Sequence, residues 1–340
     1  MPSSLTQRPG VYSDLEASEV RYSSGKGRTA GLLCLCDAVT PGLYTVASAF
    51  AASATFGAAE DITALCGLLL KNGASSVVCS VYDSETTPEA AANRFITEES
   101  AYVLACGSSE LAVQTALLSA AEGASAQRRE KICVFGMEDA DAASLTARAA
   151  ALNSERAVLV GVPSGDGIGA AAAAAGAICA ISDVAAPVVD ISLDGVTVEG
   201  MYSDNDFDAL IIGGVTPVES FGGEAAISRG VTTRTTTGGT YDTSFRELTT
   251  ILIADEVIPG IRASLGAMFR RAKNTAATRE AIRTQVILEL ESRILSEIIE
   301  SYGTVTAQAD AEDPTLCLVS FDFVVAHGLN RVHLSAVITV

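Results

Sequence analysis

Tryptophan is absent from this 340-residue sequence, and histidine is nearly so. The two histidines, His327 and His333, lie on either side of a turn close to the C-terminus, and no serine or cysteine motif accompanies them. Histidine is the side chain most often used for general acid–base catalysis, so the sequence offers little material for such chemistry. We therefore interpret both histidines as structural and do not expect an enzyme.

Long apolar runs and an excess of basic residues are also missing. No run approaches the roughly 20 apolar residues that cross a bilayer, so we expect no membrane insertion by this chain. The opening residues, MPSSLTQRPGVY, show no signal-peptide pattern, and we expect the protein to be made and kept in the cytoplasm. With 22 basic against 41 acidic residues, the net charge of −19 argues against nucleic acid and anionic lipid as partners.

Disulfide and metal-binding patterns are absent, although the chain has eight cysteines. They are scattered, mostly within apolar strand-like runs, at Cys34, Cys36, Cys66, Cys79, Cys106, Cys133, Cys179 and Cys317. Cys34 and Cys36 would face the same side of a strand, but no second Cys or His pair stands near them to complete a zinc site. We interpret the cysteines as small buried residues in a reducing compartment, and we predict neither a metal nor a cofactor.

What the sequence does contain is apolar residues, 49% of the chain, which suffice for a large core and two or three domains. Between Thr29 and about residue 183, apolar strand-like runs alternate with alanine-rich helical stretches, as in TAGLLCLC followed by DITALCGLLLKNG. Near-continuous apolar strands separated by helices are typical of a parallel sheet covered on both faces. The predicted fold class is α/β, with a parallel-type sheet core and flanking helices.

A β-rich part, about residues 184–232, completes this core domain of residues 29–232. The segment VVDISLDGVTVEG alternates apolar and polar residues around Asp194-Gly195, a pattern typical of a β-hairpin. FDALIIGGV and AAISRGVTTRTTTGG are expected to follow as strands with a connecting loop.

The C-terminal domain, residues 233–331, is predicted to be α+β. FRELTTILIADEVIPGIRASLGAMFRRA is expected to be helical with a bend at Pro259-Gly260. A second helix is predicted from Ala276 to Ser301, with Gly303 as its C-cap. Apolar residues spaced three and four apart predict that most of this helix is buried: Ile282, Val286, Leu288, Leu290, Ile294, Leu295, Ile298 and Ile299. TLCLVSFDFVV, the turn HGLN and the last residues are expected to form a hairpin.

Extended arms are predicted at both ends of the chain, in residues 1–28 and 332–340. Residues 1–28 are polar and interrupted by glycines, with too few apolar side chains for a domain. In residues 332–340, apolar side chains alternate with the period of a β-strand: Val332, Leu334, Ala336, Ile338 and Val340. Such a strand can pair with Leu318–Val325 of its own chain or join the sheet of another chain, and both can hold because a hairpin leaves one edge open.

Two segments raise the alternative of a nucleotide-binding α/β enzyme. VLVGVPSGDGIGAAAAAAG runs from an apolar strand through a glycine loop into a helix, the arrangement that binds pyrophosphate. Its spacing is Gly165-x-Gly167-x-Gly169 rather than G-x-G-x-x-G, and Asp166 would place a negative charge against a phosphate. A tight strand–helix turn is the simpler interpretation. TTRTTTGG lacks a P-loop lysine and is interpreted as an irregular connection.

One segment reverses the overall charge of the chain. Residues 261–285 contain a single acid, Glu280, against six basic residues: Arg262, Arg270, Arg271, Lys273, Arg279 and Arg283. This segment is either a solvated helix face balanced by the protein's own acids or a docking surface for an acidic protein partner.

Two segments stand out in the C-terminal third of the chain. The first is SRGVTTRTT at residues 228–236, and the second is YDTSFRELTTILIADEVIPGIRASLGAMFRRAKNTAATREAIRTQVILELE, which begins at Tyr241. Together with PGVY at residues 9–12 and the closing hairpin, these segments resemble the contractile tail sheath proteins of myophages and of R-type phage-tail-like bacteriocins. The resemblance is specific over residues 228–340 and in the N-terminal arm, and looser over residues 29–227.

This resemblance implies a structural subunit. Sheath subunits stack as hexameric rings around an inner tube in an extended metastable state, and contraction drives the tube through a target cell envelope. The implied partners are other copies of the chain, the inner tail tube protein, and baseplate and tail terminator proteins. Assembly would take place in a bacterial host cytoplasm, and the final location would be the tail of a virion or tailocin. A sheath component of a bacterial secretion system is a further alternative.

The resemblance also implies roles for particular residues. The terminal arms would complete sheets in neighbouring subunits, and the strands involved would contain Val11, Tyr12, Val20, Tyr22, Val332, Leu334, Ala336, Ile338 and Val340. Candidate hinges are Gly25, Gly27 and Gly328. A helix of the C-terminal domain would face the tube, and the implied inner-tube contacts are Arg262, Arg270, Arg271 and Lys273.

Overall fold

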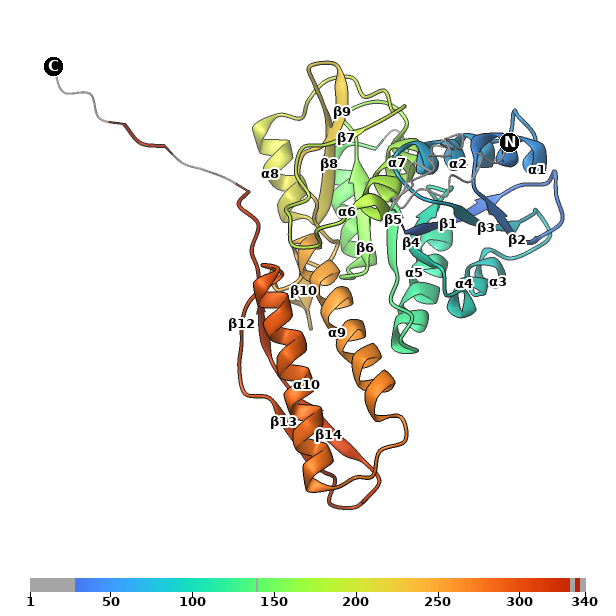
Figure 1. The fold of residues 1–340 in the computed structure, drawn as a ribbon. Coiled ribbons are helices and arrows are strands. Elements are labelled where there is room, and N and C mark those ends of the chain that lie inside the picture. The colour runs from blue at the N-terminus through green and yellow to red at the C-terminus, as the bar shows by residue number, and fades with distance from the viewer. Residues whose placement is uncertain (1–27, 139, 331–333, 337–340) are drawn as a thin grey trace, which may run out of the picture.

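A nine-stranded sheet forms the centre of the computed structural model, which describes residues 28–138, 140–330 and 334–336 (Figure 1). The strand order is β2-β3-β1-β4-β5-β6-β8-β9-β7. The bounds are β1 (Thr29–Leu35), β2 (Gly42–Val46), β3 (Val77–Tyr82), β4 (Ala101–Cys106), β5 (Ile132–Phe135), β6 (Ala157–Gly161), β7 (Ile191–Leu193), β8 (Val215–Phe221) and β9 (Glu224–Ile227). The strands from β3 to β8 in this order are parallel, and antiparallel strands form both edges. The predicted parallel-type sheet is confirmed.

Helices cover both faces of the sheet, and each face has its own hydrophobic core. One face carries α1 (Ala49–Phe56), α2 (Asp61–Lys71) and α7 (Gly167–Ala180). The other carries α3 (Pro88–Ala92), α4 (Arg94–Thr97), α5 (Leu111–Ala126), α6 (Ala142–Leu152) and α8 (Asp204–Ile212). Successive residues of one strand alternate between the two cores, as Leu32 and Leu33 do. Burial on both faces explains why the strands are apolar throughout.

Helix α7 is buried along nearly its whole length, between α2 and the parallel strands. Its alanines and glycines permit the close approach. A Cβ added at Gly176 would lie 2.5 Å from the backbone oxygen of Leu69 on α2, so this position accepts only glycine without a shift of the backbone.

Two predictions for the β-rich part are wrong. β7 pairs with β9 instead of with the residues after Asp194-Gly195, so VVDISLDGVTVEG is not a hairpin. FDALIIGGV begins as helix α8 and not as a strand. The reason is local: the Ser203 hydroxyl accepts a hydrogen bond from the backbone N–H of Asp206, and the acidic residues of the first turn favour the helix dipole.

The C-terminal domain is an α+β unit, as predicted, and it extends away from the sheet (Figure 1). Helices α9 (Leu248–Phe269) and α10 (Ala276–Leu295) pack against each other. α9 continues through Pro259, and buried residues of its first half, such as Ile253 and Val257, belong to the same core as α2 and α7. The short strands are β10 (Thr236–Thr237), β11 (Thr240–Tyr241), β12 (Ile299–Tyr302), β13 (Thr306–Ala309), β14 (Cys317–Ser320) and β15 (Phe323–Val325).

Helix α10 ends earlier than predicted, at Leu295 rather than Ser301. Glu297 adopts a left-handed backbone conformation (φ 57°), which turns the chain into β12. Ile299 is therefore buried in a strand. Gly303 is not the helix C-cap: its N–H donates to the carbonyl of Asp322 on the neighbouring strand segment.

The predicted burial of α10 is also wrong for most of the helix. Val286 and Leu290 are its buried residues, whereas Leu288 is 57% exposed and Leu295 is 85% exposed. The apolar stripe is wider than the surface that α9 and the following strands cover within one chain. An apolar face of α10 is therefore left open to solvent.

Candidate assembly surfaces

The strands after α10 form one long two-stranded ribbon with a break in its middle. β12 pairs antiparallel with β15, and β13 with β14, so residues 299–309 lie opposite residues 317–325. Helix α10 packs against β12 and β13. Within the described residues, no further strand lies beside either edge of the ribbon. A two-stranded ribbon has little stability alone, and its unpaired N–H and C=O groups can accept additional strands.

The chain after the ribbon contacts the core domain at Pro187 and the segment before α9 at Glu247. The Asn330 amide Nδ2 donates to Glu247 Oε2 at 3.3 Å, just before α9. Gly328, one of the candidate hinges, lies against Pro187, and a Cβ added at Gly328 would be 2.7 Å from the Pro187 Cβ. Close packing by itself therefore requires glycine at position 328.

Most residues of the predicted terminal strands lie outside the described part of the chain, and their roles stay predictions. These are Val11, Tyr12, Val20, Tyr22, Gly25 and Gly27 of the N-terminal arm and Val332, Ile338 and Val340 of the C-terminal strand. Leu334 and Ala336 are described; they lie in no strand, and Leu334 is 87% exposed. The own-chain alternative for this strand, Leu318–Val325, already has β12 and β13 along one side.

Arg270, Arg271 and Lys273 lie in the turn between α9 and α10, at the end of the C-terminal domain remote from the sheet (Figure 1). All three side chains are exposed. Across the ranges that the structure describes, none of the three takes part in an ion pair. We call these three residues the basic tip.

The other basic residues of the segment are held within the chain. Arg262 Nη1 lies 3.0 Å from Glu130 Oε1 in the loop before β5, so it is separated from the basic tip and joins α9 to the core domain. Arg279 donates to the side-chain oxygen of Asn274 at 2.8 Å, and Arg283 donates at 2.9 Å to a backbone oxygen in the segment before β13. The segment thus combines basic residues that are held by contacts within the chain with a projecting cationic part.

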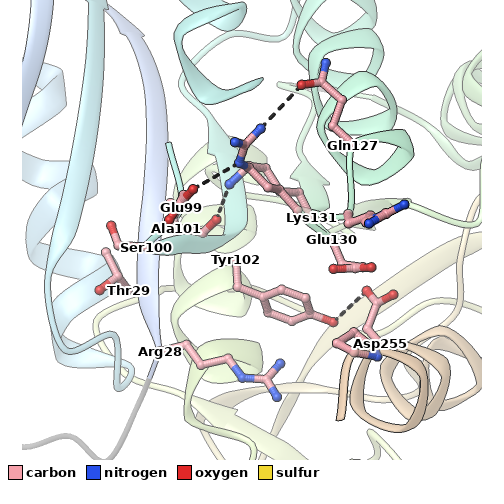
Figure 2. Close-up of a pocket in the computed structure, with 13 residues that line it drawn as sticks. Arg28, Thr29, Glu99, Ser100, Ala101, Tyr102, Gln127, Glu130, Lys131 and Asp255 are labelled. Atoms are coloured by element: carbon pink, nitrogen blue, oxygen red, sulfur yellow. Dashed lines mark hydrogen bonds and ion pairs between the residues drawn. The ribbon is translucent and has the colours of Figure 1, made fainter. Parts of the chain in front are cut away.

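A buried ionic seam joins α9 to the sheet, and the sequence analysis did not predict it. The Asp255 carboxylate on α9 accepts two hydrogen bonds from the Arg156 guanidinium, at 2.9 Å each. It accepts a third from the Tyr102 hydroxyl at 3.0 Å (Figure 2). Its side chain is only 3% exposed. Burial raises the pKa of the Asp255 carboxyl even though these donors oppose the shift. The three residues come from three distant parts of the chain, which is why no local pattern reveals them.

A cavity of about 630 Å³ lies beside the seam, between α9, the start of β4 and the loop before β5 (Figure 2). Arg28, the first described residue, stacks its guanidinium over the Tyr102 ring at 4.3 Å and pairs with Glu256 on α9 at 3.5 Å. Lys131 is 1% exposed, and its ammonium group donates to the backbone oxygens of Glu98 and of Ala101, the first residue of β4. Desolvation lowers the pKa of Lys131. Arg28 thus connects β4 to α9 beside the cavity.

Residues 240–339 match the family described as the phage tail sheath C-terminal domain. This stretch contains α9, α10, the basic tip and the ribbon. This part of the protein is similar to a tail sheath C-terminal domain. The resemblance to contractile tail sheath proteins is confirmed. No curated protein sequence matches the chain.

Solved structures share the tail sheath fold over nearly the whole chain. A structure of the anti-feeding prophage (AFP) baseplate aligns with a TM-score of 0.73 at 15% identity, covering 99% of this chain and 100% of its own. The AFP helical sheath in the contracted state aligns with a TM-score of 0.70 at 15% identity, covering 98% and 99%. The sheath tail protein from Desulfitobacterium hafniense aligns with a TM-score of 0.67 at 11% identity, covering 93% and 100%. At these identities the alignments establish the fold.

The glycine loop has a packing role in this sheath fold. Asp166 caps α7, because its Oδ1 accepts the backbone N–H of Gly169 at 2.7 Å. A carboxylate thus occupies the helix terminus where a phosphate would have to bind. A Cβ added at Gly167 would lie 2.0 Å from the backbone oxygen of Met137, so this glycine is needed for close packing. The loop is a tight strand–helix turn, and TTRTTTGG leads into a small hairpin that turns at Gly238-Gly239.

Other places where an enzyme would hold its ligands also lack suitable groups. The carboxyl ends of β1 and β4 border a cavity of about 290 Å³, but Asp61 and Glu110 line it and would repel a phosphate. In the described ranges, no group of three or more His, Cys, Asp or Glu side chains could hold a metal ion, and no helix there is long and apolar enough to cross a membrane. The cysteines are buried as predicted, apart from the half-buried Cys317. The match to the tail sheath C-terminal domain family and the sheath-like fold point to a structural protein.

Proposed function

We propose that the chain is the subunit of a contractile tail sheath. In this proposal it polymerises as stacked hexameric rings around an inner tube, is held in an extended metastable state, and contracts to drive the tube through a target cell envelope. The observation that carries the proposal is the open-edged ribbon in a tail sheath C-terminal domain, combined with terminal segments whose sequence has β-strand character. Such a ribbon can be completed by strands from neighbouring copies.

The linkage between subunits is strand addition. The strand from Val332 to Val340 and the arm around Val11–Tyr22 supply extended backbone that can pair with the open ribbon edges of other copies. Backbone hydrogen bonds hold such a mesh together, and glycines at positions 25, 27 and 328 permit reorientation at its joints. The exposed apolar face of α10 would be covered in the same assembly.

The basic tip is the proposed contact with the inner tube. Its three cations project from the end of the C-terminal domain and are not neutralised within the described chain, so an acidic tube surface would complement them. Arg262 was also assigned to the tube, but its guanidinium already pairs with Glu130. The proposal therefore rests on Arg270, Arg271 and Lys273.

Contraction needs no cofactor in this account. If the contracted lattice buries on the order of 200 Å² more apolar surface per subunit, each subunit gains roughly 5 kcal/mol at about 25 cal/mol/Å². The tube contacts have to break first, which makes the extended state kinetically stable. Baseplate and tail terminator proteins are the proposed partners at the two ends of the sheath. Assembly in a bacterial host cytoplasm is followed by residence in the tail of the released particle.

Deletion of residues 332–340 tests the linkage. The truncated chain is expected to fold with an unchanged circular dichroism spectrum and melting temperature, because the ribbon pairs β12 with β15 without it. Electron microscopy of the expressed protein is expected to show tubular polymers for the full chain and none for the truncation. Thr339→Ser, which keeps the strand, serves as the control and should polymerise. Polymers of normal length from the truncated chain would refute the proposal.

A further inference from the structure

Cys66 and Cys79 are in direct contact, with their sulfur atoms 3.3 Å apart. We propose that these two residues are a cross-linking site, able to form an intrachain disulfide between α2 and β3 when the protein meets a low-molecular-weight disulfide such as glutathione disulfide. A disulfide bond is about 2.05 Å long, so the sulfurs have to approach by only roughly 1 Å.

The other cysteines have different neighbours, although all eight lie in the described ranges. Cys34, Cys106 and Cys133 each direct their thiol to a backbone oxygen, and Cys36 faces the carboxylate of Glu60. The contact between Cys66 and Cys79 is the one thiol–thiol contact among the eight. Selectivity for this pair follows from its geometry.

Regular secondary structure holds both sulfurs in place. Cys66 lies in the middle of α2 beside the buried residues Leu65 and Leu69, and Cys79 lies in the centre of β3, which has β1 and β2 on its two sides. Both cysteines are fully buried. The contact with Cys66 and burial raise the pKa of the Cys79 thiol, so little thiolate forms at neutral pH and we expect oxidation to be slow.

The chemistry is two successive thiol–disulfide exchanges. One protein thiolate attacks glutathione disulfide, forms a mixed disulfide and releases one glutathione thiolate. The second protein thiolate then attacks the mixed disulfide at the protein sulfur, forms the Cys66–Cys79 bond and releases the second glutathione. The two protein thiols are oxidised, glutathione disulfide is reduced to two glutathione molecules, and the two protons pass to solvent or to the released thiolates.

The cross-link would constrain the unfolded chain between α2 and β3. A disulfide that closes a loop of this size raises the free energy of unfolding. For a chain of this length, we expect the melting temperature to rise by about 4 °C. We expect the bond to form after release of the particle, when the protein leaves a reducing cytoplasm and meets oxidants. This timing rests on the proposed function. The bond itself does not depend on polymerisation.

Peptide mapping of the oxidised full-length protein tests the site. The purified chain is incubated with glutathione disulfide, alkylated under denaturing conditions and digested without reductant. We expect one dominant linked peptide pair, Cys66 with Cys79, and a melting temperature that falls by about 4 °C when dithiothreitol is added. Cys66→Ala and Cys79→Ala should abolish both effects, and the control Cys133→Ala should retain both.

Two outcomes would overturn the inference. One is that Cys66 and Cys79 are still fully alkylated, and so still free thiols, after prolonged incubation with glutathione disulfide. This incubation is made at a temperature at which the wild type opens locally. The other is a dominant link between either residue and a different cysteine. Because the mass measurement is made on the wild type, poor folding of a variant does not affect it. Electron microscopy of the same samples reports on polymer formation separately, so failure of the cross-link and failure of the sheath proposal are distinguishable.

Discussion

At the scale of single residues, Asp255 connects the C-terminal domain to the sheet through Arg156 and Tyr102. These partners lie 99 and 153 positions away in the chain, so sequence patterns that reveal neighbouring residues cannot show the seam. The net contribution of a buried pair to stability is small because desolvation offsets attraction. Removal of one partner nevertheless leaves an uncompensated buried charge.

Asp255→Ala is therefore expected to lower the free energy of unfolding by about 3–5 kcal/mol, measured by urea denaturation. Glu99→Ala is the matched control, because Glu99 pairs with Arg129 but its side chain is 78% exposed. The control should cost less than about 1 kcal/mol. Equal effects of the two substitutions would show that the seam does not hold the domains together.

Lys131 gives a pH-dependent prediction. Because burial lowers its pKa in the folded chain, the unfolded chain holds the proton more tightly at pH values between that lowered pKa and the ordinary value of 10.5. Unfolding takes up a proton in this window, so the free energy of unfolding rises with pH. Urea denaturation at pH 7, 9 and 10 should show the wild type gaining stability relative to Lys131→Met as the pH rises. A difference that is constant with pH would contradict the inferred desolvation.

At the scale of elements, the sequence predicted what depends on local burial. The parallel strands and the helices around them were predictable because strands buried on both faces are apolar throughout. α8 was missed because the apolar residues of FDALII are compatible with either a strand or a helix. The Ser203 cap, which favours the helix, precedes this segment. The end of α10 was missed because its apolar spacing continues into β12, while the reversal depends on the left-handed conformation of Glu297.

The candidate site could be predicted from the sequence only in part. Counting charges along the sequence located the segment that contains the basic tip. The terminal strand inferred from the period of two stays a prediction, because most of its residues lie outside the described part of the chain. The sequence did not separate Arg262 from the tip, because the distinction depends on Glu130, a residue of the other domain. Nor could it predict the ribbon pairing, which places β14 and β15 opposite β13 and β12.

Charge reversal at the tip tests the tube contact. The double variant Arg270→Glu and Arg271→Glu should retain its fold and its ability to form tubular polymers, because both side chains are exposed and unpaired in the described chain. Co-expressed with the tube protein, it should no longer form extended sheaths on tubes. The control double variant Lys71→Glu and Arg128→Glu makes the same charge change at exposed positions elsewhere. If the tip variant formed normal tube-bound sheaths, the assignment of the basic tip as the tube contact would be wrong.

At the scale of the whole molecule, one chain leaves several features incomplete. Within the residues that the structure describes, the ribbon has open edges and the basic tip has no ion-pair partner. The outer face of α10 exposes Leu288 and Leu295. Each feature is ordinary on its own, but all occur in the stretch that matches the tail sheath C-terminal domain family. A polymer of identical copies around an acidic tube would satisfy all of them together, which is why we place the function in the assembly rather than in a pocket.

A cryo-electron microscopy map of the assembled polymer, resolved well enough to trace both termini, tests the central claim most directly. The account predicts that residues 332–340 of one copy run beside the ribbon of another copy, hydrogen-bonded to β12–β15 or β13–β14, with the arm around Val11–Tyr22 of a further copy in the same sheet. Termini that pair only within their own chain, in a polymer that is otherwise intact, would contradict it.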